Sequence, residues 1–428
     1  MRPLDAAYLT VATTTMPLWF TRMLRQGKLR TDWNGRFGHA ADLPASDRRI
    51  LLHAVSVGEV NSLRTLVSRF QNQEESVDIV ISVTTDTGYR RACELFADQV
   101  TVVRYPYDFS WAVNRFLDQV KPNIMVLVEL EAWPNMIESC RRRGVPTIVI
   151  NGRLSHRSHK RYSRIRSMVR AMFRKLQRVA VQDSTYAQRF IDLGVLPDRI
   201  EITGSMKWDT IQLDHRPTID PELVASLGID LERPLVVAGS TGPGEETLLD
   251  KAVPDDVQLL CAPRKPERFD EAAAALPGCT RRSSGSTGSP TRRFLLDTIG
   301  ELPKAYAMAD VVVVGRTFTP LGGSDMIEPL AIGKPVIIGP HVDNFESIAG
   351  RLLEAGSLLQ VAGEQLPDAI KMLLDQPDRC RLMVESGHEV IKTMQGATDR
   401  NTRLVIDELD RVHKAKMPIA TDGECSNG

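Results

Sequence analysis

The sequence has few cysteines and no excess of charge of either sign. Its 54 basic side chains equal its 54 acidic ones, so the chain as a whole creates no field that would attract nucleic acid. The cysteines lie far apart and form no C-x-x-C pair, which disfavours a zinc site and a disulfide scaffold and is typical of a reducing cytosol. They are Cys93, Cys140, Cys261, Cys279, Cys380 and Cys425. We therefore expect a cytosolic protein without a nucleic-acid partner.

A long apolar run is also missing at the amino terminus. The segment from Ala6 to Met23 is apolar and aromatic, but threonines and Pro17 interrupt it, and it falls short of the roughly 20 apolar residues that span a bilayer. Four basic residues lie at and just after the end of this segment: Arg22, Arg25, Lys28 and Arg30. This pattern suits a segment that lies on an anionic membrane surface, and an ordinary first helix packed on the protein is an equally open interpretation. No small-residue cleavage site follows, so we expect no export.

The pattern of apolar runs predicts two domains of one kind. The length of 428 residues exceeds the usual limit of about 250 to 300 residues for a single core. Short β-rich runs alternate with helical patterns, as in parallel sheets built from βαβ units. The predicted strands are Ile50–Val55, Val77–Thr84, Val100–Tyr105, Asn123–Leu130, Pro146–Ile150, Val179–Gln182 and Ile200–Thr203, then Pro234–Ala238, Val257–Ala262, Arg293–Leu296, Val311–Gly315, Pro335–Ile338 and Leu358–Val361. We predict an α/β protein with two Rossmann-like, doubly wound domains facing a central cleft.

The boundary between these domains is predicted in Lys207–Pro221, which has little apolar periodicity. Residues 1–210 form the first predicted domain, 211–413 the second, and 414–428 a frayed tail. The serine- and glycine-rich stretch Arg281–Pro290 reads as a mobile surface loop, and Arg379–His413 reads as one or two helices near the end.

The stretch HAVSVGEV, residues 53–60, predicts the end of a buried strand followed by the start of a helix, with Glu59 in the first turn of that helix. Apolar residues recur at helical spacing after Glu59. A carboxylate in the first turn faces the positive end of the helix dipole, which favours its ionised form and suits a general base. Glu59 is therefore the candidate base. The competing interpretation is a charge that only stabilises its own helix.

The stretch VELEAWPN, residues 128–135, places Glu129 and Glu131 at the carboxyl end of a strand, the edge where open α/β sheets bind ligands. If the strand persists, alternation would point both side chains to one face. A buried carboxylate costs several kcal/mol unless it is paired, which favours a functional role. The alternative is a carboxylate that caps the next helix.

Glycine turns in the second domain predict an anion site. Each joins a strand to a helix and would present backbone N–H groups to a phosphate, with Arg264 as a bidentate partner and without a metal. The turns are AGSTGPGEE at Ala238–Glu246, APRKPERF at Ala262–Phe269, TIGEL at Thr298–Leu302 and GGSDMIEP at Gly322–Pro329.

A basic stretch runs from Arg153 to Lys175. Its apolar residues, such as Val169 and Phe173, form a stripe, so the helix is expected to pack on the protein while its other face offers cations to phosphate groups at a membrane or on an acceptor. A solvated helix face is the equally weighted alternative. The cations are Arg153, Arg157, Lys160, Arg161, Arg164, Arg166, Arg170, Arg174 and Lys175.

Taken together, the motifs resemble the Kdo (3-deoxy-D-manno-octulosonic acid) transferases of lipopolysaccharide biosynthesis, in order from about Ala54 to about Ile348. The matching pieces are SVGE at Ser56–Glu59, PYD at Pro106–Asp108, NRFL at Asn114–Leu117, E-x-E-x-WPN at Glu129–Asn135, N-x-RLS-x-RS at Asn151–Ser158, TGS-x-K-x-D at Thr203–Asp209, AGST-x-x-GEE, APR-x-PERF, GEL, EP-x-A-x-G-x-PV at Glu328–Val336 and GPH-x-x-NF at Gly339–Phe345. So many ordered matches are far more specific than any single glycine turn.

The resemblance implies a GT-B fold and an inverting glycosyltransferase that needs no metal or other cofactor. It implies CMP-Kdo as donor, a lipid A precursor as acceptor on the first domain, and a place at the cytoplasmic face of the bacterial inner membrane. Glu59 would deprotonate the acceptor hydroxyl, while Glu129 and Lys207 would support the transition state. By analogy with two-lobed transferases, the last helix would cross back to the first domain. The nucleotide would lie among Pro263, Arg264, Ile299, Gly300, Glu301, Asp325, Met326, Ile327 and Glu328, with Glu328 on the ribose.

The chain departs from the family pattern in the second domain. Gly315-Arg316 stands where the family usually has two glycines, and GGSD, ending at Asp325, stands where it has GGHN. A carboxylate there would repel a nucleotide by about 1 kcal/mol unless a cation such as Arg316 or Lys265 compensates. Two alternatives therefore stay open: a related GT-B transferase or epimerase that uses another nucleotide sugar, and a non-catalytic, membrane-associated protein that binds a nucleotide.

Overall fold

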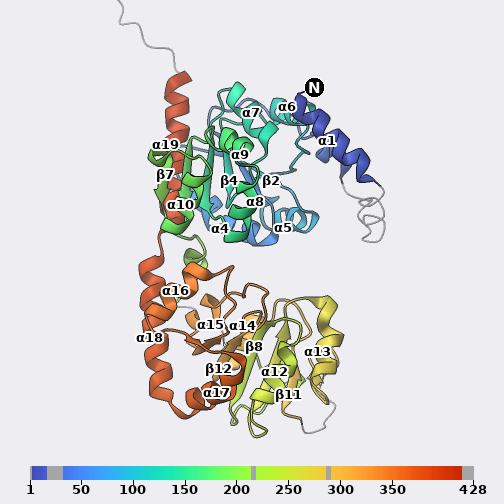
Figure 1. Ribbon diagram of the computed structural model, residues 1–428, viewed down its shortest axis with the longest axis vertical. Helices are drawn as coiled ribbons and strands as arrows, with labels where there is room; N and C mark the ends of the chain where they lie inside the picture. Colours follow the sequence, from blue (N-terminus) through green and yellow to red (C-terminus); the bar gives the residue numbers. More distant parts are fainter. Residues whose placement is uncertain (1, 17–31, 214–217, 286–290, 417–428) are drawn as a thin grey trace, which may run out of the picture. The chain divides into compact units, whose positions relative to one another are not determined.

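The computed structural model describes residues 2–16, 32–213, 218–285 and 291–416 (Figure 1). The chain folds as two compact units. Of the described residues, those up to Thr210 and those from Gly396 onward form the first unit, and Ile211–Gln395 form the second.

The first unit is built on a parallel sheet whose described strands follow the order β3-β2-β1-β4-β5-β6-β7. The strands are β1 (Arg49–Ala54), β2 (Asp78–Val83), β3 (Thr101–Arg104), β4 (Ile124–Val128), β5 (Thr147–Gly152), β6 (Arg178–Val181) and β7 (Ile200–Ile202). The helices are α1 (Pro3–Thr14), α3 (Trp33–Arg36), α4 (Val57–Gln71), α5 (Asp86–Phe96), α6 (Ser110–Val120), α7 (Pro134–Arg142), α8 (His156–Ser163), α9 (Arg166–Phe173), α10 (Ser184–Asp192) and α19 (Ala397–Lys416), with 3-10 turns η2 (Pro197–Arg199) and η3 (Trp208–Thr210).

Helices cover both faces of this sheet, which explains why its strands read as continuous apolar runs. Successive strand residues point to opposite faces, so Ile50 and Leu52 pack in one core and Leu51 in the other. Helices α4, α5 and α19 contribute side chains to the first core, and α6, α7, α9 and α10 to the second. The predicted doubly wound arrangement is confirmed.

The second unit repeats the design with the strand order β10-β11-β9-β8-β12-β13-β14, again parallel among the residues described. Its strands are β8 (Leu235–Thr241), β9 (Gln258–Pro263), β10 (Thr280–Arg281), β11 (Arg293–Leu295), β12 (Val311–Val314), β13 (Val336–Ile338) and β14 (Leu359–Gln360). Its helices are α11 (Pro221–Leu227), α12 (Glu245–Ala252), α13 (Phe269–Ala275), α14 (Leu302–Met308), α15 (Ile327–Ala331), α16 (Glu346–Glu354), α17 (Leu366–Asp375) and α18 (Pro377–Met394), with η4 (Pro266–Arg268) and η5 (Gly363–Gln365).

The predicted range 211–413 for the second domain needs a correction at its end. Helix α19 belongs to the first unit, because Leu404, Val405 and Leu409 are buried in a core that also contains side chains of β1 and β4. Figure 1 shows α19 beside the strands of this unit. The predicted crossing of the last helix is therefore confirmed. The tail beyond residue 416 lies outside the described residues.

The predicted linker Lys207–Pro221 also begins too early. Trp208 is fully buried in the first unit, and the Asp209 carboxylate accepts hydrogen bonds from the N–H groups of Gly396 and Thr398, at the start of α19. Packing therefore continues to Thr210. Residues 214–217 of the predicted linker lie outside the described part of the chain.

The predicted loop Arg281–Pro290 needs a similar correction. Arg281 ends the short strand β10, which pairs with β11 and is too short to show a sequence pattern. Arg282 forms ion pairs with Glu222 and Glu301. Residues 286–290 are outside the described ranges.

Candidate active site

The predicted catalytic carboxylates lie at the point where the strand order of the first sheet reverses. Strand β1 pairs with β2 on one side and with β4 on the other, and α4 begins directly after β1. In open α/β sheets, ligands bind at such a switch point, beyond the carboxyl ends of the strands. Glu59 follows β1, and Glu129 and Glu131 follow β4, so the sheet brings these three side chains to one place.

Glu59 completes the amino-terminal cap of α4. Ser56 is the N-cap and accepts the Glu59 N–H, while Glu59 accepts the Val55 N–H through Oε2 at 2.8 Å and the Ser56 hydroxyl through Oε1 at 3.0 Å. Glu59 therefore does stabilise its own helix, as the competing interpretation holds. A carboxylate has further lone pairs, so these bonds leave it able to accept a proton.

Burial, and next the charge of Glu129, raise the pKa of Glu59 to about 7. The net shift of the Glu59 pKa is therefore opposite to the shift that the helix dipole alone would cause. Desolvation and a neighbouring negative charge outweigh the dipole and the two cap hydrogen bonds. A pKa near neutrality is the value at which a general base is both free of its proton and basic enough to take another.

Glu129 lies in a sharp turn directly after β4. Strand β4 stops at Val128, and Glu129 has φ +60°, a left-handed conformation that costs a non-glycine residue free energy. The Glu129 N–H donates to Ile150 O at 3.0 Å, which holds this turn against β5. The strand does not persist to Glu131, so the condition for the predicted alternation of Glu129 and Glu131 is not met.

The capping alternative for these glutamates is also wrong. The first N–H groups of α7, those of Asn135 and Met136, donate to the Asp108 carboxylate at 3.0 and 2.9 Å. Among the described residues, the Glu129 carboxylate has no hydrogen-bonding partner. A half-buried carboxylate held in a strained turn without a partner is a functional candidate.

Glu131 belongs to a polar cluster with His53, which the sequence motif contained but to which no role was assigned. Its carboxylate accepts hydrogen bonds from the Thr84 hydroxyl at 3.2 Å and the Trp133 indole N–H at 3.1 Å, and lies 3.5 Å from His53 Nε2. Burial alone would raise the Glu131 pKa, but these three contacts lower it below its ordinary value. Glu131 is therefore held ionised and adds to the negative field at Glu59.

His53 is fixed by two neighbours. The register of β1 and β2 sets it beside Ser82, whose carbonyl and hydroxyl lie 3.2 Å from His53 Nδ1. Its ring stacks on Tyr105 with a centroid distance of 3.8 Å. Only the pairing of separate strands brings these groups together, so no local sequence signal could have identified them.

Lys207 follows β7 at the same edge of the sheet and is half-buried. Asn151, at φ +52°, positions the turn before it, because its side-chain oxygen accepts the Met206 N–H at 3.0 Å. Asn401 of α19 accepts the Thr203 hydroxyl at 3.3 Å. The turn that carries Lys207 is therefore held by both the sheet and the last helix.

In the second unit the strand order reverses at β8, which pairs with β9 and β12. The predicted nucleotide-binding segments follow β9, β11 and β12, so parallel pairing places them along one edge of the sheet. The turn after β8 and the loop after β12 flank the switch point.

A buried glutamate occupies the predicted phosphate position at this switch point. The Glu245 carboxylate is 1% exposed and accepts the N–H groups of Gly242 at 2.8 Å, Arg316 at 2.6 Å and Phe318 at 3.0 Å. These backbone donors are therefore already satisfied by the protein's own carboxylate. The expectation that the AGSTGPGEE turn offers its N–H groups to a phosphate is therefore wrong for Gly242, whose N–H donates to Glu245.

We expect Glu245→Gln to loosen the loop after β12. An amide has one acceptor oxygen instead of two, so at least one of the Arg316 and Phe318 donors loses its bond. The loss should lower unfolding stability by about 1–3 kcal/mol, measured by thermal unfolding. The matched control Glu267→Gln changes an exposed carboxylate and should leave the melting temperature unchanged. Equal melting temperatures for both variants would contradict the assigned role.

The next glutamate, Glu246, is buried in an ion pair. Arg268 donates two parallel hydrogen bonds to it, at 3.0 and 2.9 Å, and a further one to Thr241 O at 3.2 Å. This pair ties the GEE motif to the PERF motif and leaves Arg264, in the same turn, exposed. The two arginines of APRKPERF thus have different roles: Arg268 joins two turns of the protein, and Arg264 points into solvent.

The charges of three predicted ligands act on a buried tyrosine that the sequence did not single out. The pKa of the Tyr306 hydroxyl is raised, first by burial and then by Glu328 and Asp325, while Arg264 opposes the rise. Gly239 is required beside it, since a Cβ there would lie 1.9 Å from the Tyr306 oxygen. Burial and the Asp325 charge raise the pKa of Glu328 to about 7.

The remaining predicted nucleotide ligands differ in what they can offer. Pro263, Met326 and Ile327 are buried, so their side chains face the core, and the Ile327 N–H already donates to Asp325 Oδ1 at 2.9 Å. Asp325, which precedes the N-cap residue of α15, thus accepts the first N–H of this helix. Arg316 donates to Leu321 O at 2.8 Å and forms no ion pair with Asp325 among the described residues, so its role as the compensating cation stays a prediction.

The TIGEL turn presents one exposed apolar side chain. Ile299 is 70% exposed, and Gly300 has φ +92°, a conformation that suits glycine. The Glu301 carboxylate accepts hydrogen bonds from the Thr298 hydroxyl and from Arg282, and these lower its pKa although burial raises it. Its charge is therefore balanced within the protein.

Comparisons with known proteins identify the family of the chain. The family model "3-Deoxy-D-manno-octulosonic-acid transferase (kdotransferase)" matches residues 31–210. The 3-deoxy-D-manno-octulosonic acid transferase of Haemophilus influenzae is 32% identical over 88% of this chain and 90% of its own length. That of Bordetella pertussis is 33% identical over 92% of this chain and 96% of its own length. The chain belongs to the Kdo transferase family. It is accordingly a glycosyltransferase of lipopolysaccharide biosynthesis.

Solved structures show that this Kdo transferase has the GT-B fold. An Anabaena protein, Alr3699/HepE, solved with UDP-glucose, aligns over 85% of this chain and 99% of its own with a TM-score of 0.59 at 12% identity. The UDP-GlcNAc 2-epimerase of Neisseria meningitidis aligns over 85% of this chain and 100% of its own with a TM-score of 0.57 at 10% identity. At these identities the likeness concerns the fold alone.

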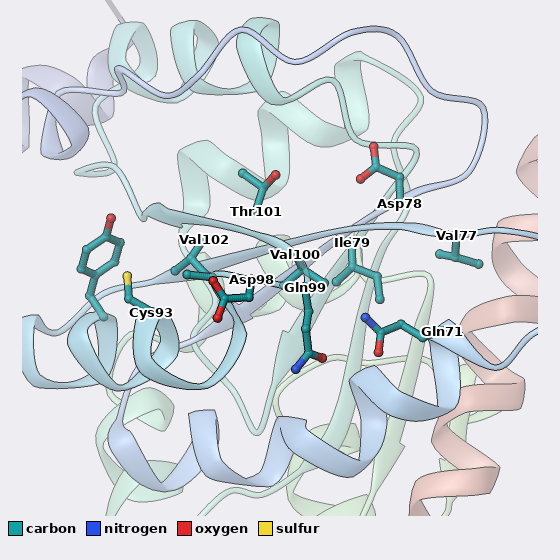
Figure 2. Close-up of a pocket in the computed structure, with 12 residues that line it drawn as sticks. Gln71, Val77, Asp78, Ile79, Cys93, Asp98, Gln99, Val100, Thr101 and Val102 are labelled. Carbon is teal, nitrogen blue, oxygen red and sulfur yellow. The ribbon is translucent and has the colours of Figure 1, made fainter.

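A polar cavity of about 630 Å³ in the transferase lies away from the candidate site. Figure 2 shows it between Gln71, Cys93 and Asp98. It also borders Asp78 and Thr101, the first residues of β2 and β3, and so opens at the amino ends of the strands. The carboxylates of the candidate site lie at the opposite ends.

Proposed function

We propose that the protein transfers Kdo from CMP-Kdo to a lipid A precursor resembling lipid IVA, with inversion and without a metal. The observation that carries this proposal is Glu59: a half-buried carboxylate with a pKa of about 7, at the switch point, beside Glu129 and Glu131. Family membership supports the sugar that is transferred.

In the proposed reaction, Glu59 removes the proton of an acceptor hydroxyl as its oxygen attacks the anomeric carbon of Kdo. The new C–O bond forms while the bond to the CMP phosphate oxygen breaks, and CMP leaves with the electron pair. A single displacement inverts the anomeric carbon. Lys207 offsets the negative charge of the phosphate or the Kdo carboxylate, and Glu129 stabilises positive charge that develops on the sugar.

The second unit supplies the proposed nucleotide site. Arg264 is exposed and lies close enough to Glu328 and Asp325 for all three charges to act on Tyr306, so it is the cation available to the CMP phosphate. Glu328, half-buried and with a raised pKa, is the proposed ligand of the ribose hydroxyls. Ile299 would cover an apolar face of the nucleotide.

The proposed site of action is the cytoplasmic face of the inner membrane, with α1 on its surface. None of the described helices is long and apolar enough to span a bilayer. The start of α1 is held by Asp5, which accepts the Ser110 N–H at 2.8 Å and the Asn135 side-chain N–H at 3.1 Å. Further along, Leu9 and Val11 are 42% and 61% exposed. The cations Arg22, Arg25, Lys28 and Arg30 lie outside the described residues.

The test is transfer by purified protein from freshly generated CMP-Kdo to a lipid A precursor, with added sugars counted by mass spectrometry. We expect product masses that increase by whole Kdo units. Thermal stabilisation by CMP but not by UDP or GDP is the expected companion result. Stabilisation by a uridine or guanosine nucleotide alone, without Kdo transfer, would favour another nucleotide-sugar enzyme.

The pH dependence of the transfer should report the Glu59 carboxylate. The base acts only when ionised, so kcat/KM should rise with pH and level off above a pKa of about 7. The variant Glu129→Gln lacks the charge that raises the Glu59 pKa, so the rise of kcat/KM should occur at lower pH in this variant. An acidic limb near pH 4.5 in the unmodified enzyme would contradict the burial of Glu59.

A further inference from the structure

Helix α8 carries a cationic face at the same edge of the sheet as the candidate base. No aspartate or glutamate occurs between Glu138 and Asp183 in the sequence. Within α8 and its C-cap, the cations lie at helical spacings of three, four and seven, which places them on one face. They are Arg157, Lys160, Arg161 and Arg164, all exposed.

This face borders a cavity. Arg157, Ser158, Lys160, Arg161 and Arg164 line a volume of about 560 Å³, and we call it the α8 basic pocket. The size lies within the range of about 300–1,000 Å³ that is typical of small-molecule sites. In the described part of the chain, no carboxylate lies within 4.0 Å of these four cations, whereas Arg141 and Arg142 on α7 both pair with Glu138.

Helix stability does not explain the cluster. Lys160 and Arg161 lie in the last turn of α8, where the helix dipole favours cations, but Arg157 lies in the first turn, where it does not. Like charges three and four residues apart also repel one another. The packing of α8 depends instead on Tyr162, which contacts the core on the other side of the helix.

The pocket lies near the catalytic carboxylates. Helix α8 follows β5, which pairs with β4, and the Arg153 N–H donates to Glu129 O at 3.3 Å. The Tyr162 hydroxyl is close enough to both Arg161 and Glu131 for their charges to act on it. An acceptor with its hydroxyl at Glu59 could therefore extend toward α8.

We propose that the α8 basic pocket binds a phosphate group carried by the sugar acceptor. This inference rests on the proposed function, since it assigns a site to one part of the proposed acceptor. Arginine and lysine together provide several charge-assisted donors to phosphate oxygens. The pocket lies at the edge of the sheet that carries Glu59, which favours a phosphate on the acceptor over a bilayer headgroup.

The test compares R157Q/R161Q with R141Q/R142Q, which removes the same charge from α7. In neutral detergent micelles, the KM for a bisphosphorylated lipid A precursor should rise about tenfold or more in R157Q/R161Q, with kcat little changed and the control unaffected. Dephosphorylating the acceptor should raise the KM of the unmodified enzyme to a similar level, and the variant should add no further loss. Equal losses with both acceptors, or an unchanged KM, would overturn the proposal.

A second measurement does not depend on transfer. In calorimetry, glucosamine 1-phosphate should bind the full-length protein and the R141Q/R142Q control. It should bind R157Q/R161Q at least about tenfold more weakly. Glucosamine, which lacks the phosphate, should bind the full-length protein more weakly than glucosamine 1-phosphate does. This result would support the pocket even if no Kdo transfer were found. If R157Q/R161Q instead lost only its binding to phosphatidylglycerol vesicles, with phosphosugar binding intact, the pocket would be a site for membrane headgroups and the proposal would be wrong.

Discussion

Glu59→Gln should reduce Kdo transfer by about 10²- to 10⁴-fold, the usual contribution of a general base. The amide keeps the size of the side chain and can still accept the Val55 N–H, but it cannot take a proton from the acceptor. Initial rates with saturating donor and acceptor would measure the loss. Stabilisation by CMP should persist, because the proposed nucleotide ligands all lie in the second unit. Turnover within about threefold of the unmodified enzyme would remove Glu59 from its assigned role.

The same variant should become more stable than the unmodified protein as the pH rises. Because the folded state raises the Glu59 pKa to about 7, the folded protein holds this proton more tightly than the unfolded chain does. The stabilisation from the protonated form is complete below the ordinary glutamate pKa and is lost as the pH rises to about 7. The amide of the variant mimics the protonated carboxyl group, so the two proteins should melt alike at about pH 4, and the variant should be more stable by about 1–3 kcal/mol at about pH 8. Exposed Glu94→Gln should show no such divergence.

Arg268→Gln should cause the largest loss of stability in the second unit. It leaves the Glu246 carboxylate, which is almost completely buried, without its cation, and breaking a buried pair in this way costs about 3–5 kcal/mol. Thermal unfolding should show a decrease of about 10 °C for the transition of this unit. The matched control Arg264→Gln, in the same turn, should melt normally and lose part of its stabilisation by CMP.

A double variant separates the ion pair from the packing around it. Arg268→Met combined with Glu246→Gln removes both charges, so no unpaired carboxylate remains, and it should recover more than half of the lost stability. Equal melting of Arg268→Gln and Arg264→Gln would contradict the structural role of Arg268. Failure of the double variant to recover would show that the shape of the arginine, and not the charge balance, is what the second unit requires.

The sequence by itself determined the two parallel sheets and the elements that carry the site. Strands such as β1 and β4 are covered on both faces, so every residue in them is apolar or paired, and a continuous apolar run is visible without any knowledge of partners. The cap of α4 is also local, since Ser56 and Glu59 are three residues apart. Ordered motifs along one chain were enough to predict the family.

The tertiary structure alone decided the electrostatics of the site. The helix dipole, which favours an ionised Glu59, is a local effect. Burial and the charge of Glu129, which is 70 residues away in the sequence, outweigh it and raise the pKa of Glu59. The sequence around Glu245 likewise predicts a phosphate-binding turn, but in the structure its carboxylate accepts the N–H groups of Arg316 and Phe318. The end of the chain packs on the first sheet for the same kind of reason, through Leu404 and Leu409. Each of these outcomes depends on groups brought together by strand pairing and packing, and no pattern of neighbouring residues contains that information.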